Sequence, residues 1–95
     1  MRLRWTRLAD RDLDEIAEYI EADNPAAAVR VVLEIINQVE TLLQEHPAIG
    51  RPGRVPGTRE LVIRGLPYIV PYRVRDNELE LLRILHTARR WPPRL

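Results

Sequence analysis

The stretch Leu66–Trp91, LPYIVPYRVRDNELELLRILHTARRW, decides the fold of this chain. Two runs rich in Val, Ile, Tyr and Leu flank the pair Asp76-Asn77, a pattern typical of a β-hairpin. We therefore expect strands over residues 68–75 and 78–87. Because alternate residues of a strand share a face, one face of the first strand carries Tyr68, Val70, Tyr72 and Val74.

The second strand of the hairpin is nearly continuous in apolar residues, which indicates a central strand covered on both sides. If this strand is continuous, Arg83 shares a face with Leu79 and Leu81, and Ile84 lies on the opposite face. Pro71 in the first strand has no N–H to donate. The pairing therefore requires a bulge or an unpaired position near it.

The residues before the hairpin predict a strand, two helices and another strand. Residues 1–8 alternate as a strand does, and a helix follows from Leu8 or Ala9. Asn24 and Pro25 suit the cap and first position of a second helix, which Pro47 ends. A loop rich in Pro and Gly (47–57) leads to a strand over 59–64.

These patterns predict one α+β domain over residues 1–95. It has an N-terminal strand, an antiparallel helix hairpin and a three-stranded antiparallel meander, in one sheet with the helices packed on one face. The apolar stripe of the second helix is unusually wide. Either the sheet covers all of it, or part is left for a partner. The stripe consists of Val29, Val32, Leu33, Ile35, Ile36, Val39, Leu42 and Leu43.

Charge is divided unevenly along the chain. Residues 1–50 carry five arginines and ten acids, a net charge of −5, whereas residues 51–95 carry ten arginines and four acids, a net charge of +6. This division predicts a basic surface built from the second half, and with it an acidic partner. All basic residues are arginines, which bind carboxylates and phosphates through two parallel hydrogen bonds and do not serve as general bases.

The acidic residues Asp10, Asp12, Asp14 and Glu15 crowd the first turns of the first helix. We interpret them as a solvated face that compensates the helix dipole, because nothing in their spacing provides the geometry of an oxygen-ligand metal site. The chain has no cysteine, which excludes disulfides and thiolate metal sites. We expect neither a metal nor a cofactor.

Two histidines and no serine limit the possible chemistry. A Ser-His-Asp hydrolase is excluded, and His46 at a helix end needs no function beyond a favourable interaction with the dipole. His86, among arginines at a strand end, is a candidate general base; the alternative is a histidine that only hydrogen-bonds there. Two function classes suit an arginine cluster around one histidine: RNA cleavage at a 2′-hydroxyl, and docking of an acidic protein surface.

The chain resembles the RelE/ParE toxin superfamily of bacterial type II toxin–antitoxin modules. Three stretches carry the resemblance: WTRLADRDLDEIAEYI (5–20), IGRPGRVPGTREL (49–61), and LPYIVPYRV with LELLRILHTARRWP (66–74 and 79–92). The resemblance implies either inhibition of DNA gyrase, as in ParE-like members, or ribosome-dependent mRNA cleavage, as in RelE-like members.

Departures from the RelE-like pattern favour the ParE-like function, a gyrase inhibitor that acts by protein–protein contact. Ile69 stands where RelE-like toxins usually have an arginine, and the chain has no lysine and no tyrosine after Tyr72. The alternative is a metal-independent, ribosome-dependent mRNA endoribonuclease that uses His86, Arg83 and Arg59. A third hypothesis is an inactive toxin that still binds its antitoxin.

The resemblance also implies a cognate antitoxin, ParD-like or other, in a hetero-oligomer. We expect an acidic, amphipathic antitoxin segment to lie across the helix hairpin and the sheet edge. No apolar run suits a signal peptide or membrane span, so we expect a cytoplasmic protein that touches neither membrane nor nucleic acid directly. The candidate contact residues for target or antitoxin are Arg51, Arg54, Arg59, Arg73, Arg83, His86, Arg89 and Arg90.

Overall fold

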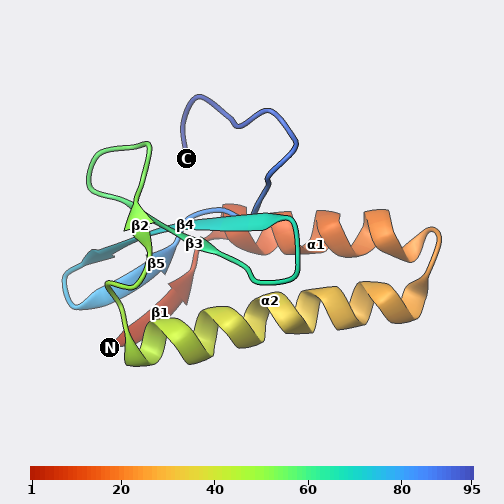
Figure 1. The fold of residues 1–95 in the computed structure, drawn as a ribbon, viewed down its shortest axis with the longest axis horizontal. Coiled ribbons are helices and arrows are strands. Elements are labelled where there is room, and N and C mark those ends of the chain that lie inside the picture. Colours follow the sequence, from red (N-terminus) through yellow and green to blue (C-terminus); the bar gives the residue numbers. More distant parts are fainter.

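The computed structural model describes residues 1–95 as one six-stranded mixed sheet packed against two antiparallel helices (Figure 1). The strand order is β1-β5-β4-β3-β2, with β6 paired to β4 beyond the end of β5. β1 runs parallel to β5, and all other pairs are antiparallel. The elements are β1 (Arg2–Trp5), α1 (Arg7–Glu21), α2 (Pro25–Glu45), β2 (Arg51–Pro52), β3 (Arg59–Val62), β4 (Tyr68–Arg75), β5 (Glu78–Leu81) and β6 (Leu85–His86). The predicted α+β fold is confirmed, and the short strand β2 is an addition within the predicted loop.

Both helices begin at side-chain caps. The Thr6 hydroxyl accepts a hydrogen bond from the Ala9 N–H at 3.2 Å, so α1 begins at Arg7, slightly earlier than predicted. Asn24 caps α2 as predicted, because its side-chain oxygen accepts from the Ala27 N–H at 3.0 Å. The same Thr6 hydroxyl donates to the Leu82 carbonyl, which fixes the start of α1 to the sheet.

The predicted hairpin turn at Asp76-Asn77 is confirmed. Both residues have positive φ, 53° and 61°, as a two-residue turn between twisted strands requires. This turn sets the register that pairs Arg73 with Glu80 and Arg75 with Glu78.

The prediction of one continuous strand over 78–87 is wrong. β5 ends at Leu81 and β6 begins at Leu85, so three residues face the two residues Val70 and Pro71 of β4. This extra residue is the bulge that Pro71 was expected to require. The bulge reverses the alternation, and Ile84 rather than Arg83 therefore joins Leu79 and Leu81 in the core.

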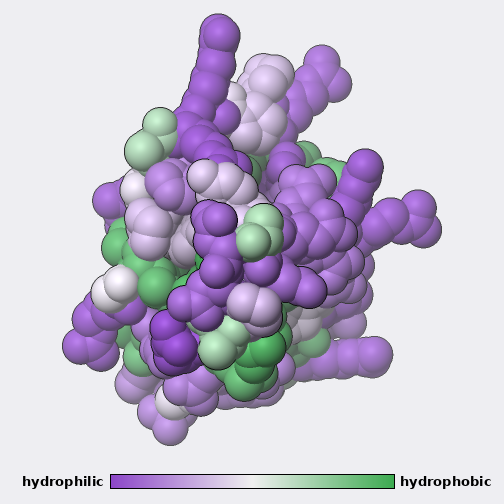
Figure 2. All heavy atoms as spheres, turned by 90° about the vertical axis from the view of Figure 1, so that its right-hand side faces the viewer, coloured by the Kyte–Doolittle hydropathy of each residue, from purple (hydrophilic) through white to green (hydrophobic).

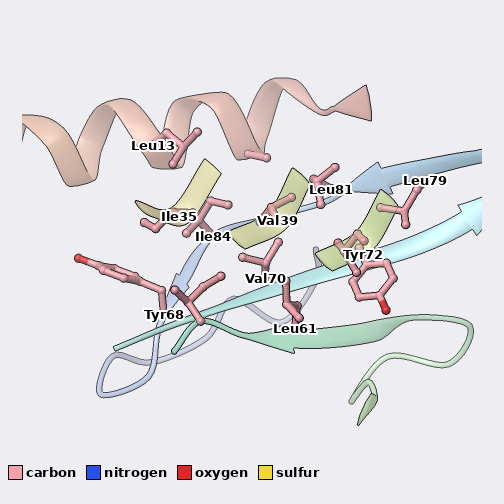
Figure 3. Packing of buried hydrophobic residues seen from close by; sticks show 13 residues of the cluster. Leu13, Ile35, Val39, Leu61, Tyr68, Val70, Tyr72, Leu79, Leu81 and Ile84 are labelled. Atoms are coloured by element: carbon pink, nitrogen blue, oxygen red, sulfur yellow. The ribbon is translucent and has the colours of Figure 1, made fainter. Parts of the chain in front are cut away.

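The core lies between the two helices and the face of the sheet that they cover (Figure 3). Tyr68, Val70 and Tyr72 point into it from one face of β4, as predicted. Ile35, Val39 and Leu43 of α2 are fully buried, but Val29 and Leu33 are 61% and 59% exposed. The sheet thus leaves part of the α2 stripe uncovered.

The end of the molecule that carries the α1–α2 turn is mostly hydrophilic, with separate hydrophobic areas (Figure 2). Neither helix combines the length and apolar character needed to cross a membrane. No three acidic or histidine side chains come together in a way that would hold a metal ion.

Candidate functional site

The three buried charged side chains are carboxylates, and each holds one of the predicted contact arginines. They are Asp12, Glu60 and Glu80, which are 8%, 4% and 4% exposed. A buried carboxylate is stable only when it is paired and hydrogen-bonded. The arginines of the second half therefore do not form one open basic face: three of them neutralise acids of the same chain.

Asp12 corrects our interpretation of the acidic run as a solvated face. Its carboxylate accepts hydrogen bonds from Arg83 Nε at 2.8 Å and Nη2 at 3.0 Å, and from the Ile84 backbone N–H at 2.8 Å. The bond to Asp12 is the main reason why the pKa of Arg83 is raised. Because two of its donors are occupied, Arg83 serves chiefly to join α1 to the bulge between β5 and β6.

The other two buried carboxylates lie on the sheet face away from the helices. Glu80 accepts from Arg73 Nε at 2.7 Å and also pairs with Arg4 of β1. Glu60 pairs with Arg51 at 3.2 Å and accepts from the Arg54 backbone N–H at 2.9 Å. Arg73 and Arg51 are thus tied across strands.

The remaining predicted residues divide between two places. Arg59 donates to the Gly50 carbonyl at 2.9 Å and stays beside β2. Arg54, His86, Arg89 and Arg90 lie around the C-terminal segment 87–95, which we call the tail; it rises away from the strands on the side opposite α2 and curls back (Figure 1).

A cavity of about 340 Å³ opens between α1, β6 and the tail. It gathers four predicted residues, Arg83, His86, Arg89 and Arg90. It does not include Arg51, Arg54, Arg59 or Arg73, so the nuclease set of His86, Arg83 and Arg59 does not meet in one place. The remaining lining residues are Asp12, Glu15, Ile16, Tyr19, Tyr68, Ile84, Leu85, Trp91 and Pro92.

His86 is held in a defined orientation at this cavity. The Ala88 backbone N–H donates to Nδ1 at 3.0 Å, and the ring meets Tyr68 edge-on at 5.4 Å between centroids. A neutral imidazole whose Nδ1 accepts a hydrogen bond carries its proton on Nε2. His86 therefore presents an N–H donor at its second nitrogen.

Two tyrosines form aromatic walls of the cavity. Tyr19 on α1 is 68% exposed, and the Arg89 guanidinium lies 5.2 Å from its ring centroid. Burial raises the pKa of Tyr68, the Arg89 charge lowers it in part, and Tyr19 raises it further. Figure 3 shows the Tyr68 hydroxyl pointing away from the other labelled core residues. The two phenols and the Arg89 charge thus interact at the mouth of the cavity.

Trp91 connects the tail to the Pro- and Gly-rich loop through a contact with Arg54. Arg54 from the Pro- and Gly-rich loop stacks over the indole ring, 3.7 Å from its centroid, which is close enough for a cation–π interaction. The indole Nε1 is the one buried side-chain nitrogen or oxygen that lacks a hydrogen-bond partner within the chain.

The sequence pattern identified neither Tyr19 nor Asp12 as a site residue, because both belong to a helix whose pattern shows only amphipathicity.

Comparison with known proteins places the chain in a family. Residues 3–91 match the family model of the ParE toxin of the type II toxin–antitoxin system parDE. The chain is 52% identical over 91 residues to a Sinorhizobium fredii protein named "Putative toxin Y4kP", covering 96% of this chain and 93% of that protein. It is 38% identical over 85 residues to toxin RelE2 of Caulobacter vibrioides, covering 90% of this chain and 93% of that toxin.

Two solved structures share the fold. A chain of the chromosomal ParDE system from P. aeruginosa matches with a TM-score of 0.84 and 39% identity. A chain of the RelBE2 toxin–antitoxin complex from Mycobacterium tuberculosis matches with a TM-score of 0.64 and 26% identity. Each match covers 90% of this chain and 95% of the other. The likeness is thus greater to the structure from the ParDE system.

Proposed function

This chain belongs to the ParE toxin family of type II toxin–antitoxin systems, and we propose that it inhibits DNA gyrase through protein–protein contact. In this proposal it acts in the cytoplasm, without a metal or cofactor, and a cognate antitoxin neutralises it. Greater similarity to a ParDE structure than to a RelBE2 structure supports the choice of gyrase over the ribosome.

The observation that carries the proposal is the pairing of Arg83 with Asp12. An arginine that stabilises a phosphorane needs donors free to meet the developing charge. Two donors of Arg83 are committed to Asp12 at 2.8 and 3.0 Å, and Arg59 lies outside the cavity that holds His86. A docking surface has no such requirement, because exposed arginines around the tail can meet an acidic protein surface without a shared reaction centre.

One observation supports the alternative function, ribosome-dependent mRNA cleavage. His86 lines a cavity with Arg89, Arg90 and two tyrosines, and the chain is 38% identical to toxin RelE2 of Caulobacter vibrioides. In that case Arg89 or Arg90 would meet the phosphate, and His86 would have to give up the hydrogen bond from the Ala88 N–H before its Nδ1 could take the proton of the 2′-hydroxyl.

The antitoxin partner in this proposal is an acidic, amphipathic segment that lies across the helix hairpin and the sheet edge. Val29 and Leu33 of α2 are exposed one helical turn apart and offer an apolar stripe to such a segment. The unpaired arginines of the second half of the chain would attract its acidic residues.

The test compares two reactions with the same purified protein. We expect a block of gyrase-dependent supercoiling that added antitoxin reverses, and no cleavage of mRNA on translating ribosomes. The double substitution R89A/R90A should weaken inhibition, whereas the matched R75A, remote from the cavity, should not. Ribosome-dependent cleavage that H86A abolishes would reverse the choice of target. Absence of growth arrest on induction without antitoxin would instead indicate an inactive toxin.

A further inference from the structure

We propose that the cavity beneath the tail is a carboxylate-binding site, and that its occupant is a carboxylate of the antitoxin set beside an apolar side chain. The assignment to the antitoxin rests on the proposed function. The affinity of the cavity for carboxylates is a property of this chain alone and can be measured without either partner.

The fold leaves several hydrogen-bond donors around the cavity unused. The Trp91 ring lines the cavity, and its indole N–H is buried without an acceptor, so a ligand can bond to it once the neighbouring side chains shift slightly; an unsatisfied buried donor of this kind is unfavourable. His86 offers Nε2–H, because its Nδ1 accepts from the backbone. Arg89 and Arg90 line the cavity and form no ion pair within the chain.

The side-chain acceptors on the cavity wall are too few to bond all of these donors. Asp12 is occupied by Arg83 and the Ile84 N–H, and Glu15 forms no hydrogen bond or ion pair within the chain. With neutral His86, three arginines and two acids give the lining a net charge of +1. A ligand that brings one negative charge and only acceptor oxygens satisfies these donors, and a carboxylate is such a group.

The walls determine what accompanies the carboxylate. Ile16, Leu85 and the rings of Tyr19, Tyr68 and Trp91 provide apolar surface, and about 340 Å³ is far more than a carboxylate fills. A carboxylate next to an apolar side chain uses both kinds of surface. A nucleic-acid backbone suits the cavity less well, because its successive phosphates would face Glu15 as well as the arginines.

Two sources can supply this chemistry: a C-terminal carboxylate on an apolar residue, or an acidic side chain next to one. Trp91 lines the cavity, so its indole signal reports on ligands from either source. The chain has two tryptophans, so the ¹H–¹⁵N spectrum of the full-length protein contains two indole signals, and W91F identifies that of Trp91. The probes are N-acetyl-leucine, N-acetyl-leucyl-glutamate with an amidated C-terminus, and N-acetyl-leucinamide, which lacks a carboxylate.

We expect one or both carboxylate probes to move the Trp91 indole proton downfield in a saturable manner, while the Trp5 signal stays fixed and the amide has no effect. R89A should weaken binding about tenfold, as expected for loss of one charge-assisted hydrogen bond. R94A is the matched control, because Arg94 is a tail arginine that does not line the cavity. W91F removes the indole donor and replaces the indole by a smaller phenyl ring, and it should weaken probe binding as followed by the backbone amide signals of Tyr19 and His86.

Equal shifts with the amide, or no shift with either carboxylate, would overturn the proposed site. Saturation by inorganic phosphate in place of the carboxylates would also overturn it. In the toxin–antitoxin complex, the Trp91 signal should already lie at its shifted position and no longer respond to the probes. An unshifted, still responsive signal would refute the antitoxin as occupant. Because none of these measurements involves gyrase, failure of the gyrase proposal is separately visible in the supercoiling assay.

Discussion

Asp12 and Arg83 are 71 residues apart in the chain, yet the Asp12 carboxylate accepts two hydrogen bonds from the Arg83 guanidinium. The same carboxylate also accepts the Ile84 N–H, which the bulge removes from the strand ladder. One side chain of α1 therefore satisfies both the charge and the backbone donor that the break between β5 and β6 leaves unpaired. Asp12 thereby holds in place the segment Arg83–His86, which forms one wall of the cavity.

Replacing Asp12 by Asn should destabilise the protein strongly. Loss of one partner leaves a mostly buried guanidinium without its counter-charge, which typically costs 3–5 kcal/mol. Because the Arg83 side chain is 19% exposed, water recovers part of this, and we expect about 2–3 kcal/mol in urea unfolding. Asp14→Asn is the matched control, because Asp14 is exposed on the same helix, and should change the unfolding free energy by less than about 0.5 kcal/mol. Equal effects of the two substitutions would contradict this role for Asp12.

The stability of the protein should fall above about pH 10 because of Tyr72. Burial raises the pKa of Tyr72 above its ordinary value of 10.0, although a hydrogen bond from Gly50 and the Arg59 charge lower it in part. Above that value the unfolded chain loses the phenol proton while the folded chain retains it. The unfolded state then binds fewer protons, and the free energy of unfolding decreases as pH rises.

Tyr72→Phe tests this dependence. The hydroxyl accepts from the Gly50 N–H at 2.9 Å and donates to the Pro47 carbonyl at 2.8 Å, so the variant should lose about 1–3 kcal/mol at neutral pH. It should also show a shallower alkaline decline than the parent in urea unfolding between about pH 8 and pH 11. An unchanged alkaline slope would show that Tyr72 is not its source.

Gly50→Ala should destabilise through a direct clash. A Cβ at this position would lie 2.6 Å from both Cε1 and the hydroxyl oxygen of Tyr72, a fully buried side chain. We expect a loss of about 1–3 kcal/mol in thermal unfolding, as for an overpacked core. In the Tyr72→Phe background the same substitution should cost less, because one of the two clashing atoms is gone. Equal costs in both backgrounds would place the strain elsewhere.

The double substitution Val29→Ser and Leu33→Ser should weaken antitoxin binding without unfolding the toxin. Both side chains are more than half exposed, so we expect little change in the urea midpoint. Loss of two apolar contacts should weaken the affinity about tenfold or more in calorimetric titration with antitoxin. Asn37→Ser with Thr41→Ser, at exposed positions further along α2, is the matched control. Unaltered affinity in the Val29 and Leu33 variant would exclude this stripe from the antitoxin interface.

Local patterns predicted the parts of the fold that depend on neighbouring residues. Asn24 and Pro25 start α2, and Asp76-Asn77 make the hairpin turn, because caps and turns act within a few residues. The turn also contained the signal for one ion pair: a two-residue loop at 76–77 places Arg73 opposite Glu80. The prediction that Arg73 belongs to an open arginine face conflicts with this register, which pairs it with Glu80.

The features that sequence patterns missed depend on distant residues. Nothing near Asp12 indicates that its partner is Arg83. Pro71 indicated that a bulge was needed, but the apolar run through Leu82 hid the fact that the opposite strand carries it. Likewise, Trp91 and Arg54 meet only after the loop and the tail are brought together. The cavity beneath the tail is formed by three such separate segments, and for this reason it could not be located from the sequence.

The parallel pairing of β1 with β5 determines when the sheet can be completed during synthesis of the chain. β1 is synthesised first, but its only neighbour in the sheet, Glu78–Leu81, emerges when more than four fifths of the chain has been made. The sheet therefore closes late, as contacts of long sequence separation do. Val29 and Leu33, by contrast, lie in a helix hairpin whose residues end at Glu45. During translation, the residues of the stripe proposed for the antitoxin are thus synthesised before any of the arginine-rich half of the chain.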